Sequence, residues 1–254
     1  MPLTNIIKEH IKKDGPISFR DFMELSLYHP EHGYYTSFST PDKIGKNGDY
    51  FTSSTLTPVF GTMIGKQIEE MWNILGEEEF TIVKYGAGTG LLCRAILDYF
   101  KPNKKLFEKL RYCIIEKSPA MREKAKSHLS EKVHWHDSIH DIPALIGCVL
   151  SNELVDNFSV HRVVMKDELM EVYVDYTNEF TEVLKPASKN LTEYLNELKV
   201  ELPKEFCTEI NLEATHWLKE ISKALKKGYV ITIDYGHPSC ELYSEYRSSG
   251  TLVC

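Results

Sequence analysis

Three glycines on alternate positions, Gly86, Gly88 and Gly90, follow a short apolar run at residues 81–85. Glycine lacks a Cβ atom, so a chain with this spacing can turn sharply and let a ligand approach its backbone. Apolar residues with helical spacing follow the glycines. The pattern therefore predicts a strand, a ligand-binding turn and a helix, although a glycine turn that binds nothing would have the same sequence.

Carboxylates follow the next two apolar runs of the chain. Glu116 ends the run at residues 110–115, and at the tip of a second strand it could accept both ribose hydroxyls of a nucleoside ligand. A solvated strand-end carboxylate is the alternative for Glu116. Asp137 and Ser138 follow a third run, at the place where such a fold usually reads the amino group of adenine.

A fourth apolar run, at residues 147–151, ends in Asn152, Glu153 and Asp156, and a fifth run precedes Asp234. Ligands of open α/β sheets bind outside the carboxyl ends of the strands, so these polar groups should lie at one edge. Glu153 and Asp156 are three residues apart and share a face if the segment turns or becomes helical. Asn152 and Asp156 could equally cap the strand end, and both roles can hold together.

Five sequence blocks in this order resemble the MidA-type S-adenosylmethionine-dependent methyltransferases, a family that includes a mitochondrial complex I assembly factor that methylates an arginine. The G-x-G-x-G spacing also matches motif I of class I methyltransferases, and the resemblance extends over residues 17–254. The blocks are Gly48-Asp49-Tyr50-Phe51-Thr52, Tyr85-Gly86-Ala87-Gly88-Thr89-Gly90, Glu116-Lys117-Ser118-Pro119, Ser151-Asn152-Glu153-Leu154-Val155-Asp156 and Ile233-Asp234-Tyr235-Gly236.

The resemblance implies S-adenosyl-L-methionine as the cofactor and a protein as the substrate. The expected methylation site is an arginine side chain, for example in a subunit of a respiratory complex. The expected catalytic residues are Asn152, Glu153 and Asp156, since a guanidinium needs carboxylates to hold it and to take up charge. The expected cofactor-binding residues are Asp49, Thr52, Gly86, Gly88, Gly90, Glu116, Asp137 and Ser138. Asp49 and Thr52 come from the resemblance alone, and ordinary turn chemistry is their alternative.

Two departures from the family pattern bear on activity. Lys84 stands where motif I normally has an acid, which places a positive charge near a cationic ligand, unless the flexible side chain carries it to water. The family chain also continues past a segment like residues 249–254. These departures favour a second hypothesis, a cofactor-binding assembly or interaction protein that has lost catalysis. The glycine spacing disfavours a third, a nicotinamide oxidoreductase.

The order of the runs predicts an α/β fold: a Rossmann-like class I methyltransferase sheet with helices on both faces. We expect a helical section at residues 1–75 and the methyltransferase domain at 76–254, with an insertion at about 160–226. The insertion should contain a hairpin at residues 160–176 and then helices. The last strands of a seven-stranded sheet should be missing.

Composition narrows the function further. The formal charge of −7 argues against a nucleic-acid partner, and six cysteines without a C-x-x-C pair indicate free thiols in a reducing compartment. No run approaches the ~18 apolar residues of a membrane span, and no leader pattern is seen, so we expect no membrane insertion and a cytoplasmic protein. His134 and His136 lack further ligands at suitable spacing, so no metal is expected. The sequence does not indicate an oligomeric state.

Overall fold

The computed structural model of the chain describes residues 2–38, 48–49, 57–129 and 132–252. The chain divides into two compact units. One comprises Met1–Tyr34, Asn157–His216 and Tyr235–Cys254, and the other comprises Tyr35–Asp156 and Trp217–Asp234. This division differs from the expected boundary at residue 75, because the first 34 residues belong with the inserted segment and the following helix belongs with the parallel sheet.

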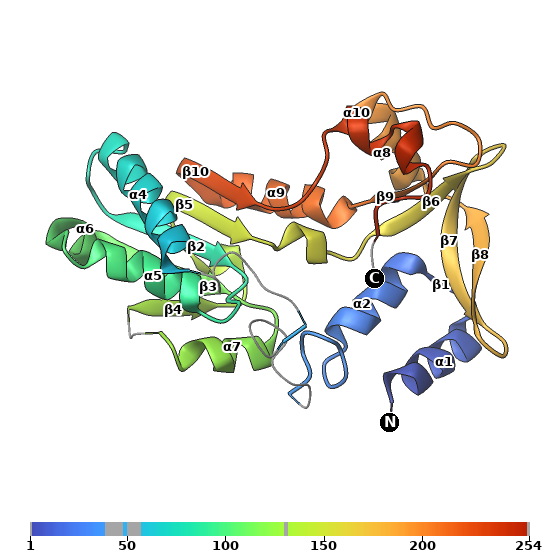
Figure 1. Ribbon diagram of the computed structural model, residues 1–254, viewed down its shortest axis with the longest axis horizontal. Helices are drawn as coiled ribbons and strands as arrows, with labels where there is room; N and C mark the ends of the chain where they lie inside the picture. Colours follow the sequence, from blue (N-terminus) through green and yellow to red (C-terminus); the bar gives the residue numbers. More distant parts are fainter. Residues whose placement is uncertain (1, 39–47, 50–56, 130–131, 253–254) are drawn as a thin grey trace. The chain divides into compact units, whose positions relative to one another are not determined.

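The second unit is built on a parallel sheet of five strands (Figure 1). Their order is β10-β5-β2-β3-β4, and every neighbouring pair is parallel. These are the five apolar runs singled out from the sequence, so the predicted α/β fold with a parallel sheet is confirmed. The strands are β2 (Phe80–Tyr85), β3 (Leu110–Ile115), β4 (Val133–His136), β5 (Leu145–Asn152) and β10 (Leu225–Ile233).

The strand register brings the carboxyl ends of the sheet into one row. Tyr85 of β2 lies opposite both Ile115 of β3 and Ser151 of β5, and Ile115 lies opposite His136 of β4. The residues after these positions therefore leave the sheet along the same edge, as the sequence predicted.

Helices cover both faces of this sheet. One face packs against the helices that follow β2 and β3 and against the helix before β2, in a core that includes Ile82, Ile114 and Leu150. These helices are α4 (Pro58–Ile74), α5 (Leu91–Phe100), α6 (Lys104–Lys109) and α7 (Pro119–Lys126). On the other face, Trp217 of α9 (Leu212–Ala224) makes an edge contact with the ring of Tyr85, with centroids 5.5 Å apart.

The first unit contains an antiparallel sheet with the order β1-β7-β6-β9, in which β8 also pairs with β7. The hairpin of β6 and β7 was predicted from the alternating apolar residues. Strand β8 was missed because most of its side chains are exposed, and β9 because it is only four residues long. The strands are β1 (Ile17–Ser18), β6 (His161–Met165), β7 (Leu169–Tyr176), β8 (Phe180–Pro186) and β9 (Cys207–Ile210).

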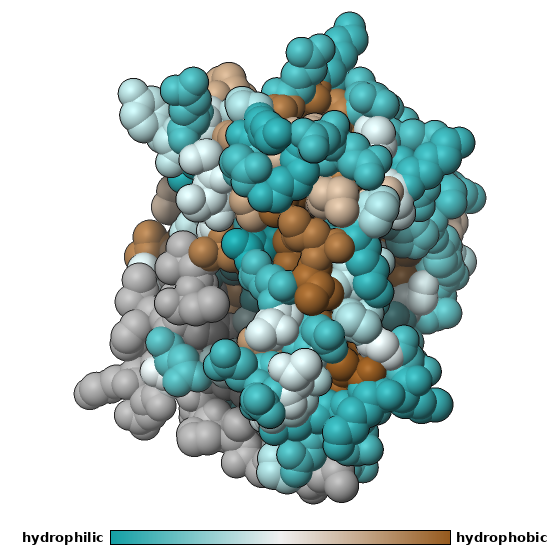
Figure 2. Space-filling view, turned by 90° about the vertical axis from the view of Figure 1, so that its right-hand side faces the viewer, coloured by the Kyte–Doolittle hydropathy of each residue, from teal (hydrophilic) through white to brown (hydrophobic). Residues whose placement is uncertain are grey.

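Short helices complete this unit, and the predicted cap of one of them is confirmed. The Ser18 side chain accepts a hydrogen bond from the Asp21 N–H at 3.1 Å, which begins α2. Hydrophilic residues cover most of the face seen in Figure 2, and hydrophobic residues form separate small groups. The helical segments of the first unit are α1 (Leu3–Asp14), α2 (Phe19–Tyr28), η2 (Val155–Asn157, at the boundary), α8 (Lys189–Leu198), α10 (Ser239–Leu242) and η3 (Glu245–Arg247).

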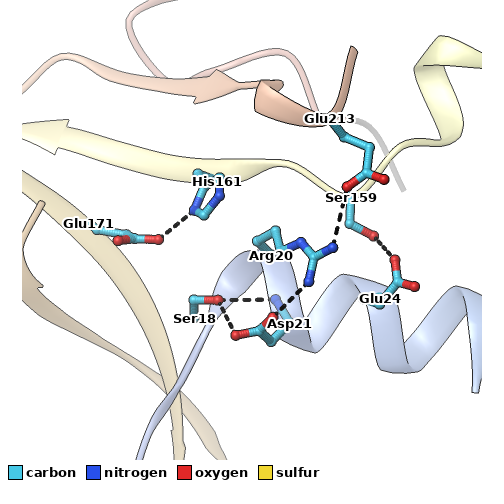
Figure 3. A network of polar contacts seen from close by, with 8 residues as sticks. All are labelled: Ser18, Arg20, Asp21, Glu24, Ser159, His161, Glu171 and Glu213. Atoms are coloured by element: carbon cyan, nitrogen blue, oxygen red, sulfur yellow. Dashed lines mark hydrogen bonds and ion pairs between the residues drawn. The ribbon is translucent and has the colours of Figure 1, made fainter. Parts of the chain in front are cut away.

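Polar side chains join α2 to two other segments of the first unit (Figure 3). Arg20 donates to Glu213 of α9 at 3.3 Å. The Ser159 hydroxyl, just before β6, donates to Glu24 of α2 at 2.9 Å.

A separate pair lies within the antiparallel sheet. Glu171 of β7 is buried and lies 2.6 Å from Nδ1 of His161 in β6, so its carboxylate has a partner inside the sheet.

Candidate functional site

The glycine turn after β2 is held against the end of β3. Gly86, Gly88 and Gly90 have φ angles of 72°, 57° and 83°, in the left-handed region that favours glycine. The Gly86 N–H donates to the Ile115 carbonyl at 2.9 Å, and the Ala87 N–H donates to Glu116 Oε2 at 2.6 Å. The turn is therefore fixed in one conformation before any ligand binds.

Gly88 lies beside open space. A Cβ atom built on Gly88 would have no heavy atom within 4 Å among the described residues, whereas one on Gly90 would come within 3.1 Å of the Ala125 carbonyl oxygen. Gly90 is thus required for packing of α5 against α7. Gly88 instead leaves its backbone accessible, as a turn that binds a nucleoside cofactor would need, so the residues present fit such a group.

Glu116 is the second part of the site. Its Oε2 accepts from Ala87 as above, and its Oε1 accepts from the Ser118 N–H at 2.7 Å. A carboxylate oxygen has two lone pairs, so each oxygen can still accept one hydroxyl. Both oxygens are thus oriented by the backbone and remain able to bind the two hydroxyls of a ribose.

Ser118 is a residue whose role was not predicted. It is buried, it caps α7 by accepting from the Met121 N–H at 3.2 Å, and its hydroxyl donates to the Tyr35 carbonyl at 2.5 Å. Its one N–H orients Glu116 while its hydroxyl fixes the loop at Tyr35. The Ser-Pro start of a helix directly after Glu116 was the available signal.

The segment after β5 lies against the glycine turn. A Cβ atom on Gly86 would stand 3.5 Å from Cδ1 of Leu154. Asp234, at the end of β10, holds this segment, since its Oδ2 accepts from the N–H groups of Leu154 at 3.1 Å and Val155 at 2.7 Å. The predicted catalytic segment and the predicted cofactor turn are therefore neighbours. Asp234, expected at this edge but without a stated role, holds the segment in place.

The predicted catalytic side chains differ in their surroundings. Asn152 donates from Nδ2 to Glu153 Oε1 at 3.3 Å, while its buried Oδ1 has no hydrogen-bond partner among the described residues. Glu153 has φ of +48°, and its N–H donates to the Ile233 carbonyl at 2.8 Å. Asp156 is exposed. The orphaned amide oxygen is an acceptor that a bound donor could satisfy, which fits a substrate-binding role for Asn152.

The end of β4 is arranged differently. Asp137 pairs with Arg122 of α7 at 2.9 Å, and its side chain is 86% exposed. Ser138 forms a capping box with Asp141 at the start of η1 (Ile139–Asp141), so its hydroxyl and N–H serve that turn. Both residues take part in local structure.

His136, the last residue of β4, has a buried Nε2 for which the described part of the chain offers no hydrogen-bond partner. Burial lowers the pKa of His136, and the nearby Arg111 lowers it further, so its neutral form is favoured. Of the two residues taken from the resemblance alone, Asp49 is exposed and Thr52 lies outside the described residues.

Lys84 is buried, with 4% of its surface exposed, and its Nζ donates to the carbonyl of Gly86. The suggestion that the side chain carries its charge out to water is therefore wrong. Burial lowers the pKa of Lys84, while Cys93 and Glu116 act in the opposite direction. The amine lies directly under the glycine turn.

Among the described residues, no three His, Cys, Asp or Glu side chains are placed to hold a metal ion. In the same part of the chain, no helix combines the length and apolar character needed to cross a membrane.

Residues 63–254, three quarters of the chain, match the family described as "Putative S-adenosyl-L-methionine-dependent methyltransferase". The chain belongs to this family, the MidA-type methyltransferases. Its cofactor is S-adenosyl-L-methionine, as the resemblance implied.

Relatives of known description agree with this family. The chain is similar to the mitochondrial protein arginine methyltransferase NDUFAF7 of Homo sapiens (24% identity over 93% of this chain) and to its Drosophila melanogaster homolog (25% over 92%). The matches span 59% and 60% of those two proteins, so the chain corresponds to about three fifths of their length. Both names include the word mitochondrial, which leaves the expected cytoplasmic location a prediction.

A solved structure shows the same fold. A superfamily member from Burkholderia thailandensis, bound to S-adenosyl-homocysteine, superposes with a TM-score of 0.85 at 24% identity. The superposition covers 98% of this chain and 66% of that one. The likeness supports the arrangement of the strands and helices described above.

Proposed function

We propose that this chain is a methyltransferase that binds S-adenosyl-L-methionine at the Gly86–Gly90 turn and transfers its methyl group to an arginine of a protein. The observation that carries the proposal is the hydrogen bond from the Ala87 N–H to Glu116, beside the open space at Gly88. This hydrogen bond holds the carboxylate that would bind the ribose next to the backbone of the glycine turn. The chain's family uses a cofactor that contains a nucleoside.

The bound cofactor supplies a methyl group on a sulfonium, ready for in-line displacement. The chain's own contribution is positioning. Glu116, oriented by Ala87 and Ser118, accepts the ribose hydroxyls, and the bare backbone at Gly88 lets the ligand approach. Gly90 and the Gly86 N–H keep the turn in place, so little conformational entropy is lost on binding.

The acceptor side requires a different chemistry. An arginine guanidinium is always protonated in water, so a site for it needs acceptors that hold the planar fork and take up charge as a proton leaves. The orphaned Oδ1 of Asn152 can accept one N–H, and the carboxylate of Glu153 can accept another. We assign to Glu153 the uptake of the proton that leaves the guanidinium. Asp156 lies at the exposed end of the same segment.

Two further observations support the arginine. The NDUFAF7 proteins that the chain resembles are named protein arginine methyltransferases. The segment that contains Asn152 and Glu153 also lies next to the glycine turn. A Cβ atom on Gly86 of the turn would stand 3.5 Å from Leu154 of that segment. A protein is therefore the proposed partner.

A second candidate is a cofactor-binding protein without catalysis, and the burial of Lys84 under the turn favours it. The buried amine disfavours a cationic ligand, which would weaken binding of S-adenosyl-L-methionine more than binding of its neutral product.

Methyl transfer separates the two candidates. The full chain is incubated with methyl-labelled S-adenosyl-L-methionine and a pool of peptides with one central arginine, and the same pool with lysine serves as the control. Label on the arginine pool alone, lost in Glu153→Gln, supports the proposal. Binding of S-adenosyl-homocysteine without transfer to either pool would support the second candidate.

A further inference from the structure

Lys84 is the last residue but one of strand β2, just before the glycine turn. Side chains of a strand alternate between faces, so Lys84 points to the same side as Ile82, which belongs to the core under α5. Its amine reaches back to the carbonyl of Gly86. No water-exposed position is available to an amine held in this way.

Among the described residues, two groups act on the charge of this amine, and one of them is itself charged. They are the thiol of Cys93 in α5 and the carboxylate of Glu116 after β3. Burial raises the pKa of Cys93 to about 12, so the thiol is neutral, and burial raises that of its neighbour Tyr112 well above the ordinary value. Glu116 is also the residue that binds the ribose.

The start of α5 adds a second unfavourable effect for a cation. Cys93 is in the first turn of α5, and the N-terminus of a helix carries a partial positive charge. Burial also lowers the pKa of Lys84, because the charged amine loses its hydration.

We propose that Lys84 sets how strongly the site distinguishes the sulfonium cofactor from its neutral thioether product. This inference rests on the proposed binding of the cofactor at the glycine turn. Both ligands carry the same adenosine and the same amino acid group, and they differ in one positive charge at sulfur. A cationic Lys84 under the turn repels only the sulfonium, whereas a neutral Lys84 repels neither.

The hydrogen bond to Gly86 and the charge of Lys84 have separable effects. Loss of the hydrogen bond loosens the turn and lowers the affinity for both ligands by the same factor. Losing the charge changes only the ratio of the two affinities. Lys84→Met removes the donor and the charge, while Lys84→Gln removes the charge and keeps an N–H donor of similar reach.

The experiment is a calorimetric titration of the full chain and both variants with S-adenosyl-L-methionine and with S-adenosyl-homocysteine, at pH 6.5 and pH 8.5. Comparison with the variants at the same pH cancels titration of the ligands' own amino groups. At pH 6.5 we expect both variants to shift the affinity ratio toward the sulfonium by about tenfold relative to the unsubstituted chain. Because burial lowers the pKa of Lys84, the shift at pH 8.5 should be no larger than the shift at pH 6.5.

Three outcomes would decide against the inference. An affinity ratio equal in all three proteins at both pH values would show that the Lys84 charge does not reach the ligand. An equal loss of both ligands in Lys84→Met, with no change of ratio in Lys84→Gln, would leave Lys84 a purely structural support. If the unsubstituted chain bound neither ligand, the proposed function itself would fail. If Lys84→Met does not fold, Lys84→Gln alone decides.

Discussion

Glu116 and Asp137 follow neighbouring strands of the same sheet, and each was expected to bind the cofactor, yet their surroundings differ. Glu116 is half-buried and accepts backbone N–H groups from the glycine turn and from Ser118. Asp137 is almost fully exposed and pairs with Arg122. Backbone donors on both oxygens orient a carboxylate in a way that a single exposed ion pair does not. Partners, more than position in the sheet, therefore distinguish the two acids.

Substitutions in the glycine turn and at Glu116 should weaken cofactor binding more than substitutions at Asp137. The largest effect is expected at Gly88. In Gly88→Val a branched side chain enters the open space and must adopt φ near +57°. We expect S-adenosyl-homocysteine affinity to fall by about a hundredfold or more. The backbone strain is confined to the turn and the Cβ atom meets no heavy atom of the described residues, so the fold should be retained. Calorimetry gives the affinity and circular dichroism the fold.

A matched glycine provides the control for that substitution. A Cβ atom on Gly147 of β5 would stand 2.0 Å from the Thr81 carbonyl oxygen, so Gly147→Ala should lower the melting temperature. Unchanged binding in Gly88→Val would mean that the turn holds no ligand.

Glu116→Ala should have the next largest effect. It leaves the ribose hydroxyls and the Ala87 N–H without a charged acceptor, a loss of about 1.5–3 kcal/mol, which is roughly 10- to 150-fold in affinity. The check is a titration with S-adenosyl-homocysteine alongside a melting curve. A lower melting temperature with full affinity at low temperature would show that Glu116 serves the turn and not the ligand.

Glu153→Gln tests the acceptor side. The amide keeps the shape of the side chain and the contact with Asn152, but it cannot take up the positive charge of the substrate. We expect turnover to fall by about tenfold or more, with cofactor affinity unchanged, the pattern of a contact made only in the transition state. Single-turnover methylation of an arginine peptide and a separate cofactor titration measure the two quantities. Loss of cofactor affinity would move Glu153 to the cofactor side.

The smallest effect is expected for Asp137→Asn. An exposed ion pair contributes about 0–1 kcal/mol, so affinity for S-adenosyl-homocysteine should change by less than about fivefold. Arg122→Gln, which removes the other partner, should behave in the same way. If Asp137→Asn weakened binding as much as Glu116→Ala, Asp137 would leave Arg122 for the adenine when the cofactor binds, and the comparison above would be wrong.

The sequence predicted the parallel sheet well, for a physical reason. Buried parallel strands are continuous apolar runs, and the residues that follow them, Gly86, Glu116 and Asn152, stand out by type. The antiparallel unit was predicted less completely, since its sheet combines residues near Ile17 with the inserted hairpin, and an exposed strand such as β8 has no apolar alternation.

Side-chain partners could not be predicted from the spacing. Ser118 and Asp234 act through backbone hydrogen bonds to segments remote in sequence, which no local pattern encodes. Lys84 was recognised as unusual, but its burial follows from the alternation of β2 together with the packing of α5, and only the structure shows both.

The most direct test of the account is a crystal structure of the chain with S-adenosyl-homocysteine. We predict that the ribose hydroxyls lie within hydrogen-bond distance of both Glu116 oxygens and that the ligand contacts the backbone at Gly88, while the pair of Asp137 and Arg122 is unchanged. A ligand bound away from the Gly86–Gly90 turn, or a ribose that does not contact Glu116, would contradict the account.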